Sequence, residues 1–249
     1  MQLLSPPWTK PGGLLSGKVS AYSTMRDGGA SSAPFDTLNL GMHVGDDPAS
    51  VQANRERVCD WMSAPSAPLW LEQVHGNRII DATDWQPGIQ ADGMHCSAVG
   101  EVAVVMTADC LPILLATDDG SEVAAVHAGW RGLAAGILEH AVAAIQAPPS
   151  RLLAWIGPAI SQAAFEVGDE VRDAFVRRNH LATNCFVPNA RERWQADLAM
   201  LACLEFRVLG VHRLSDAGRC TALEPGAFFS HRRSAPCGRM ASFIWRNRG

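Results

Sequence analysis

The sequence predicts a single-domain α/β protein in which helices flank a layered, mixed β-sheet. Through the middle of the chain, short apolar and β-branched segments alternate with segments of helical periodicity, which is the pattern of a layered α/β fold. The chain has 249 residues, 47% of them hydrophobic, and this suffices for one large core. Neither an internal repeat nor a low-complexity segment divides it. We therefore expect one domain over residues 1–249.

The first third of the chain is expected to hold a strand, a long loop and a helix. Residues 18–24, KVSAYST, have the composition of a strand. Residues 26–41 are rich in Gly, Ser, Pro and Asn, which predicts a loop. Asp47 is a good N-cap residue and Pro48 suits the first helical position, so a helix is predicted from about Pro48 to Met62.

The middle of the chain supplies most of the predicted sheet. Residues 69–76, LWLEQVHG, predict a strand that continues at 78–80 after a turn. Residues 101–107 and 111–117 are apolar and β-branched throughout, so both are expected to be buried strands. A third such strand is predicted over 121–129.

The remaining segments alternate between helix and strand. In residues 133–145 the apolar side chains recur at the spacing of a helix that faces a core. Residues 152–158 predict a strand closed by Gly-Pro, and 211–216 predict another. Helices are expected over 167–179 and 194–210.

Charge and cysteine content exclude several classes of protein. The net charge is −4 and the arginines are dispersed, with the densest pairs at 177–178 and 232–233, so the chain lacks the basic stripe typical of nucleic-acid binding. No apolar run is long enough to span a membrane, and the N-terminus does not resemble a signal peptide. The seven cysteines are odd in number and form no CxxC motif, which favours reduced thiols. We expect a cytoplasmic monomer with neither a nucleic-acid nor a membrane partner.

Three residues that can bind a metal, His75, Cys110 and His127, each lie at the end of a predicted strand. They are separated by 35 and 17 residues, whereas structural zinc sites use closely spaced pairs and four protein ligands. Three ligands from separate strand ends would leave one tetrahedral position open, as a catalytic zinc requires. Alternatively, the three are ordinary core or surface groups, and spacing alone does not decide between these interpretations.

The turn that follows His127, with the sequence GWRG, is a candidate anion site. Gly129 and Gly132 flank an expected helix N-terminus, where free N–H groups and the helix dipole favour negative charge. Arg131 lies in the same turn and could clamp a phosphate or carboxylate. The alternative is a tight strand-to-helix turn with Trp130 packed on the core.

Seven blocks of the sequence carry a resemblance to a known family. They are RDGGASSAPFDTLNLGMHVGDDPASVQANR, WLEQVHG, VVMTADCLPILL, VAAVHAGWRGLAAGILE, WIGPAISQAAFEVGDEV, CTALEPGAFFSHRR and GRMASFIWR. These blocks are similar to those of the YfiH family, whose members are labelled laccase-domain or multicopper polyphenol oxidase proteins and also purine nucleoside phosphorylases. Two positions depart from the family pattern: His231 replaces the usual tyrosine, and Cys237 replaces a frequent threonine. The first departure bears on substrate preference.

The resemblance implies a fold, a metal and a reaction. The fold is the α/β type shared with the catalytic domain of cytotoxic necrotizing factor. The metal is a single zinc ion held by His75, Cys110 and His127. The reactions are phosphorolysis of adenosine, inosine, guanosine and methylthioadenosine, together with deamination of adenosine in the same pocket. Purine nucleosides and phosphate are therefore the expected partners.

Several further residues are candidates for parts of this chemistry. Asp109, beside Cys110, is a candidate proton shuttle, and the alternative is a carboxylate that only holds a turn. Cationic side chains suit phosphate, and the candidates that lie in matching blocks are Arg26, His43 and Arg131. Asn39 and Ser23 are candidates for ribose binding, although Asn39 could equally hold its own loop. The motifs of the base-editing zinc deaminases are absent, so any deaminase activity has another design.

Other functions use the same residues. One copper ion at the trio could oxidise phenols, since copper outcompetes zinc for such ligands, but the chain's eight histidines are scattered and form no H-x-H pair for a three-copper cluster. Alternatively, Cys110 is the nucleophile and His127 the base of an amidohydrolase that acts on a peptidoglycan precursor. A thiolate bound to zinc is a poor nucleophile, so this mechanism excludes the zinc mechanism. A binding module without catalysis is the last alternative.

Overall fold

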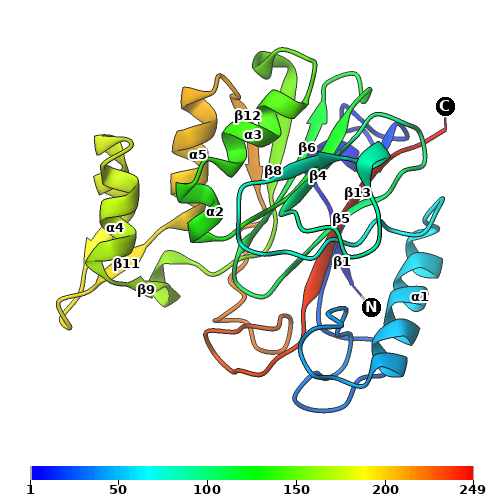
Figure 1. Cartoon of the computed structure of the whole chain (residues 1–249), viewed down its shortest axis with the longest axis horizontal. Coiled ribbons are helices and arrows are strands. Elements are labelled where there is room, and N and C mark those ends of the chain that lie inside the picture. The colour runs from blue at the N-terminus through cyan, green and yellow to red at the C-terminus, as the bar shows by residue number, and fades with distance from the viewer. Residues whose placement is uncertain (1, 249) are drawn as a thin grey trace.

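Two β-sheets lie face to face between two layers of helix, which confirms the predicted layered α/β fold (Figure 1). The computed structural model describes residues 2–248. Helix α1 (Pro48–Met62) covers the outer face of the four-stranded sheet. The outer face of the six-stranded sheet is covered by α2 (Trp130–Ala134), α3 (Ile137–Ala144) and α5 (Leu198–Val208).

The larger sheet is mixed and the other two are antiparallel. In spatial order the larger sheet holds β12 (Arg213–Asp216), β8 (Leu152–Ile156), β6 (Leu111–Thr117), β7 (Val123–Ala128), β4 (Gly93–Cys96) and β3 (Ile79–Asp81), with only the two outermost pairs parallel. The four-stranded sheet holds β1 (Leu3–Leu4), β2 (Val19–Thr24), β13 (Met240–Arg246) and β5 (Ala103–Thr107). A small sheet holds β10 (Phe186–Pro188), β11 (Trp194–Ala196) and β9 (Glu166–Val167), beside α4 (Asp169–Val176). Short 3₁₀ helices are η1 (Pro7–Thr9), η2 (Ala82–Asp84), η3 (Pro149–Arg151), η4 (Gln162–Ala164) and η5 (His180–Cys185).

Strand β6 shows why the central segments of the sequence are apolar throughout. Side chains alternate between the two faces of a strand. Ile113 and Leu115 therefore pack toward the helices, while Leu114 and Ala116 pack toward the four-stranded sheet. Because both faces of the larger sheet are covered, every residue of β6 is buried.

The predictions for the first third of the chain are confirmed. The strand over 18–24 is β2, and the described residues between it and α1 form neither helix nor strand. Helix α1 begins at Pro48, and the Asp47 carboxylate accepts hydrogen bonds from the N–H groups of Ala49 (3.4 Å) and Ser50 (3.0 Å). These bonds satisfy N–H groups that have no partner within the helix.

The strand predicted over 69–76 is wrong. This segment makes only isolated bridges, from Leu69 to Ala103 and from Glu72 to Gln90. Its end is curled rather than extended, since His75 has a φ of 60°. The N–H groups around His75 bond to a carboxylate instead of a neighbouring strand, and this bonding is described with the metal centre below.

Two helix predictions are partly wrong. The helix predicted over 133–145 is broken at Gly136, which has a φ of 84°, so that α2 and α3 are separate. The helix predicted over 194–210 begins only at Leu198, because the Asp197 carboxylate caps it by accepting from Met200 N at 2.8 Å. The preceding residues belong to β11.

The structure also describes two features related to the expected location of the protein: the length of its helices and the state of its cysteines. Among residues 2–248, no helix combines the length and apolarity needed to cross a bilayer. All seven cysteines are free thiols.

One half-buried carboxyl group in α5 is expected to make stability depend on pH. Glu205 is half-buried, its Oε1 has no hydrogen-bond partner within the described chain, and burial raises its pKa to about 7. Because the folded pKa lies above the unfolded value, the group costs nothing below about pH 4 and its full cost appears above pH 7. Glu205→Gln should therefore stabilise the protein by on the order of 2 kcal/mol at pH 8 and by almost nothing at pH 4. Urea unfolding at both pH values measures the difference, and an equal effect at pH 4 and pH 8 would contradict this explanation.

Candidate metal centre

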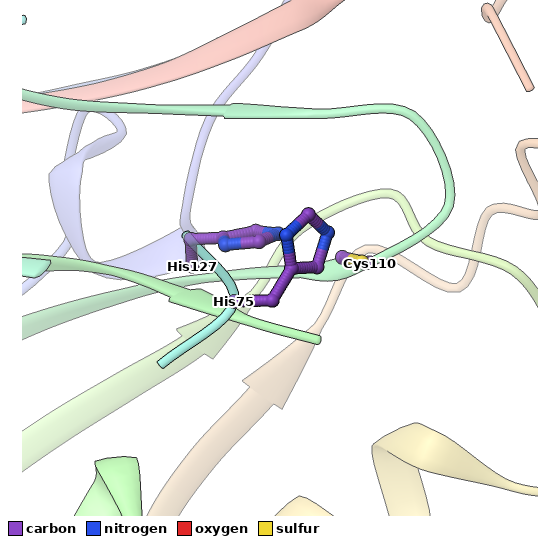
Figure 2. Close-up of side chains that lie close together, drawn as sticks. All are labelled: His75, Cys110 and His127. Atoms are coloured by element: carbon purple, nitrogen blue, oxygen red, sulfur yellow. The ribbon is translucent and has the colours of Figure 1, made fainter. Parts of the chain in front are cut away.

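His75, Cys110 and His127 converge at one end of the six-stranded sheet (Figure 2). Their candidate ligand atoms all lie within 4.8 Å of one another. Cys110 immediately precedes β6 and His127 lies near the end of β7, and these two strands are hydrogen-bonded neighbours. His75 comes from the curled segment, and its ring stands edge-on to that of His127, with centroids 4.8 Å apart.

Asp92 holds both the curled segment and one ligand in place. Its carboxylate is fully buried and accepts from His127 Nδ1 at 2.8 Å. It also accepts from the N–H groups of His75 (2.9 Å) and Gly76 (2.7 Å). These bonds leave Nε2 of His127 as the nitrogen free to bind a metal, as in the carboxylate–histidine pairs of zinc proteins. The prediction from sequence did not include Asp92.

Charge in the trio suits a metal that prefers thiolate and imidazole. Burial disfavours ionisation of the Cys110 thiol, but His127 and His75 outweigh burial and lower its pKa to about 6. Burial acts against charge on His127 as well, but Cys110 and Asp92 raise its pKa to about 9. Both shifts favour a thiolate beside an imidazolium in the metal-free site, and a bound cation would replace the proton of His127.

Gly129 and Gly132 are explained by close contacts at the site. A Cβ atom on Gly129 would lie 3.0 Å from Cys110 Sγ and 3.2 Å from His75 Cδ2. A Cβ atom on Gly132 would lie 2.4 Å from the carbonyl oxygen of Gly76. Helix α2, for which Gly129 is the N-cap residue and in which Gly132 lies, is only five residues long. The structure thus gives both glycines a role in packing beside the ligands, and anion binding at this turn stays a prediction.

Gly129→Ala is expected to weaken metal binding by about tenfold while the fold is retained, because the added methyl group displaces two ligands by a few tenths of an ångström. Competition with a chromophoric chelator measures the affinity. Gly226→Ala is the matched control, since a Cβ atom there meets nothing within 4 Å. Equal metal affinities for the two variants would contradict the proposed crowding.

The trio opens into a cavity of about 350 Å³. Apolar and aromatic side chains, including Trp130, Ile160 and Phe165, form part of its lining. Three arginines, Arg131, Arg232 and Arg239, also line it, whereas Asp109 is the only carboxylate in the lining that the structure describes. The cavity is therefore large enough for a small organic molecule and favours a negatively charged group.

Asp109 reaches the cavity but is held firmly by protein groups. The Thr221 hydroxyl donates to its Oδ1 at 2.6 Å, and the Arg232 N–H donates to its Oδ2 at 2.7 Å. Its backbone has a φ of 100°, a conformation that side-chain-bearing residues rarely adopt. The carboxylate thus lies at a fixed position beside Cys110.

Of the cations predicted to bind phosphate, two reach the cavity. Arg131 is exposed there, with its guanidinium 4.7 Å from the centroid of the Trp130 ring. His43 also lines the cavity, and burial followed by the nearby Arg239, Arg55 and His75 lowers its pKa. Arg26 does not line it: its guanidinium donates to the carbonyl oxygen of Asp36 at 2.7 and 2.9 Å.

The two residues predicted to bind ribose are internal in the structure. Asn39 is fully buried, and its amide bonds to the backbone of Gly41 and to Asp46, so it holds its own loop. Ser23 is buried in β2, where its hydroxyl lies 2.9 Å from the hydroxyl of Ser242. Neither residue belongs to the lining of the cavity.

Comparison with known proteins identifies the family. Residues 20–247 match the model of the family described as multi-copper polyphenol oxidoreductase laccase. The chain is 45% identical to the purine nucleoside phosphorylase YfiH of Escherichia coli (strain K12) over 98% of each chain. It belongs to the YfiH, or laccase-domain, family.

Other members of the YfiH family agree over nearly the full length. The chain is 45% identical to the purine nucleoside phosphorylase PA4543 of Pseudomonas aeruginosa, over 97% of each chain. The crystal structure of protein NMB0706 of Neisseria meningitidis matches with a TM-score of 0.92 and 40% identity over 99% of each chain. That of YlmD from Geobacillus stearothermophilus matches with a TM-score of 0.86 and 31% identity over 94% of each chain.

Several cavity residues of this YfiH-family protein were not predicted. Arg239 and Arg232 lie near the C-terminus, and Phe165 follows η4, far in sequence from the metal ligands. Gln73 was missed too; its amide exchanges two hydrogen bonds with the backbone of Met106, at 2.7 and 2.8 Å. The FFSHRR and GRMASFIWR blocks were the available signal, because both contribute residues to the lining.

Proposed function

We propose that this protein is a zinc-dependent purine nucleoside phosphorylase. The observation that carries the proposal is one cavity that combines the His-Cys-His trio, aromatic surface and three arginines. The names of relatives at 40 to 45% identity support the same activity. We further propose that it acts as a single domain and as a monomer. We also propose that it acts in the cytoplasm, a location that its seven free cysteines support.

The donor set fits a zinc ion. His75, Cys110 and His127 offer two imidazoles and one thiolate, and the Asp92 bond presents Nε2 of His127 to the cavity. Three protein ligands leave a position open, which is typical of catalytic rather than structural zinc. When bound there, zinc would supply Lewis-acid and charge-stabilising chemistry to a substrate.

The protein's own groups have separate tasks in this proposal. Trp130 and Phe165 offer flat apolar surface to a purine, and cationic side chains bind phosphate. Asp109 holds a proton-accepting carboxylate beside the metal ligands, fixed by Thr221 and by the Arg232 N–H. Adenosine, inosine, guanosine and methylthioadenosine are the proposed substrates. Deamination of adenosine in the same cavity, with Asp109 moving the proton, is the proposed second activity.

A second candidate function is amide hydrolysis by Cys110. The observation in its favour is the closeness of Cys110 to His127, which lowers the pKa of the thiol and raises that of the imidazole, as in the activated nucleophile of cysteine hydrolases. A peptidoglycan precursor is the candidate substrate. A single copper ion at the trio, with oxidation of phenols, is the candidate that the laccase description of the family supports.

One assay separates these functions. Zinc and copper are counted per chain, and the protein is then incubated with adenosine, with and without phosphate. Adenine and ribose 1-phosphate formed only with phosphate are expected, and inosine reports deamination. If the metal-replete protein leaves every listed nucleoside unchanged, the proposed function is wrong.

A further inference from the structure

One part of the cavity lining holds Arg239, which has no carboxylate partner within residues 2–248, and His43, whose ring can donate a hydrogen bond. His43 and Arg239 both line the cavity. Arg239 donates Nη1 to the carbonyl oxygens of Cys237 (2.8 Å) and Gly238 (3.1 Å). Within residues 2–248 it makes no ion pair. Its remaining N–H groups are therefore available to a ligand.

A second arginine, Arg55, lies near His43. Arg55 of α1 donates Nε to the carbonyl oxygen of Leu40 at 3.0 Å, and its guanidinium lies 3.7 Å from the centroid of the Trp70 ring. It too has no carboxylate partner within the described chain, and burial lowers its pKa to about 10. Arg55 adds to the positive potential at His43. We call the two arginines Arg239 and Arg55, together with His43 beside them as a neutral hydrogen-bond donor, the cationic wall.

Asn39 fixes the geometry of the cationic wall. Its Oδ1 accepts from the N–H of Gly41 and from the N–H of Arg239, both at 2.9 Å. The loop that carries His43 is thereby joined to the C-terminal segment that carries Arg239. Gly41 allows the close approach, since a Cβ atom there would lie 2.8 Å from Arg239 Cγ. The wall is thus preorganised before any ligand binds.

The other arginines of the lining are engaged with aromatic rings. The Arg131 guanidinium lies 4.7 Å from the Trp130 centroid, and that of Arg232 lies 5.2 Å from the Phe165 centroid. Arg232 also donates to the carbonyl oxygen of Glu166 at 2.9 Å. This part of the lining presents extended flat surface, which suits a heterocyclic base better than a compact anion.

We propose that the cationic wall, through His43 and Arg239, holds the phosphate substrate, while Trp130 and Phe165 hold the purine. The inference rests on the proposed phosphorolysis and assigns its two substrates to different parts of one cavity. In that reaction a phosphate oxygen forms a bond to C1′ of the ribose as the C1′–N bond breaks. The electron pair of that bond leaves with the purine, which takes up a proton, and no oxidant or reductant is required.

The test compares substrate dependences of variants of the zinc-loaded protein. Arg239→Gln and His43→Gln should each raise the KM for phosphate by about tenfold or more, since each removes a charge-assisted hydrogen bond, and should leave the KM for inosine within about twofold. Arg239→Lys should restore part of the phosphate affinity. Arg177→Gln is the matched control, because that side chain, which directly follows α4, is 80% exposed and lies outside the cavity lining. Because His43 is exposed, its variant keeps the test valid if Arg239→Gln fails to fold.

Calorimetry measures the binding of inorganic phosphate directly, in the absence of nucleoside. This measurement separates the inference from the proposed function. Phosphate that binds the wild type and binds Arg239→Gln at least about tenfold more weakly supports the cationic wall, even if no nucleoside is cleaved and the proposed function fails. Phosphorolysis that proceeds with an unchanged phosphate KM in both Arg239→Gln and His43→Gln overturns the cationic wall and leaves the proposed function intact.

Discussion

His75→Ala is expected to release the bound zinc and to reduce phosphorolysis by about a thousandfold or more, since a metal supplies several kcal/mol of transition-state stabilisation. Loss of one of three protein ligands leaves too few donors for tight binding. The side chain is exposed in the cavity, so its removal leaves no buried void and the fold should persist. Metal content by atomic absorption and initial rates with inosine and phosphate measure the two effects.

His212→Ala is the control for this experiment, because His212 is exposed and lies outside the cavity lining. It should retain both zinc and activity. Full activity of His75→Ala without bound metal would contradict the metal-dependent mechanism. That outcome would favour Cys110 acting as a nucleophile with His127 as its base.

Asp92→Asn is expected to lower zinc affinity by about 10- to 100-fold, the range found for partners that orient a metal-binding histidine. Its carboxylate is completely buried and accepts from His127 and from the backbone of the His75 segment. An asparagine amide can replace only some of these acceptors, and its NH₂ group would face an N–H donor. The metal-free variant should also lose roughly 1 to 3 kcal/mol of unfolding free energy, because buried donors lose their acceptor.

Chelator competition and urea unfolding of the metal-free protein measure these two quantities separately. Asp60→Asn is the matched control, since Asp60 is exposed near the end of α1, far in sequence from the ligands. A variant with normal zinc affinity would show that Asp92 serves only the fold. A variant with normal stability and weakened zinc binding would show that its effect is confined to His127.

The strands in the middle of the chain with continuous apolar character were predictable from sequence. The strand near the C-terminus was not. Strand β6 is buried on both faces, so every one of its residues carries the signal. Strand β13 was missed, although it lies between β2 and β5 in the four-stranded sheet. Its place depends on pairing with segments more than 130 residues away, which no local pattern reports.

The metal ligands could be proposed from sequence because histidine and cysteine are rare and stood at predicted strand ends. The residues that support them could not. No sequence feature distinguishes Asp92 from the other aspartates, and only the folded chain brings its carboxylate to the N–H groups of the His75 segment. These hydrogen bonds also explain why the strand prediction for residues 69–76 is wrong. They hold the end of the segment in a curled conformation that presents His75, whereas a strand would pair its backbone with a neighbouring strand. Arg26 and Asn39 also lie in matching family blocks, but in the structure their side chains bond within loops and do not line the cavity.

The most direct test of the central claim is a zinc titration of the metal-free protein, followed by phosphate-dependent cleavage of inosine. A single site formed by His75, Cys110 and His127 predicts that activity is nearly absent at the start, rises linearly with added zinc and stops rising at one ion per chain. Full phosphorolysis by the metal-free protein, or activity that needs more than one ion per chain, would contradict it.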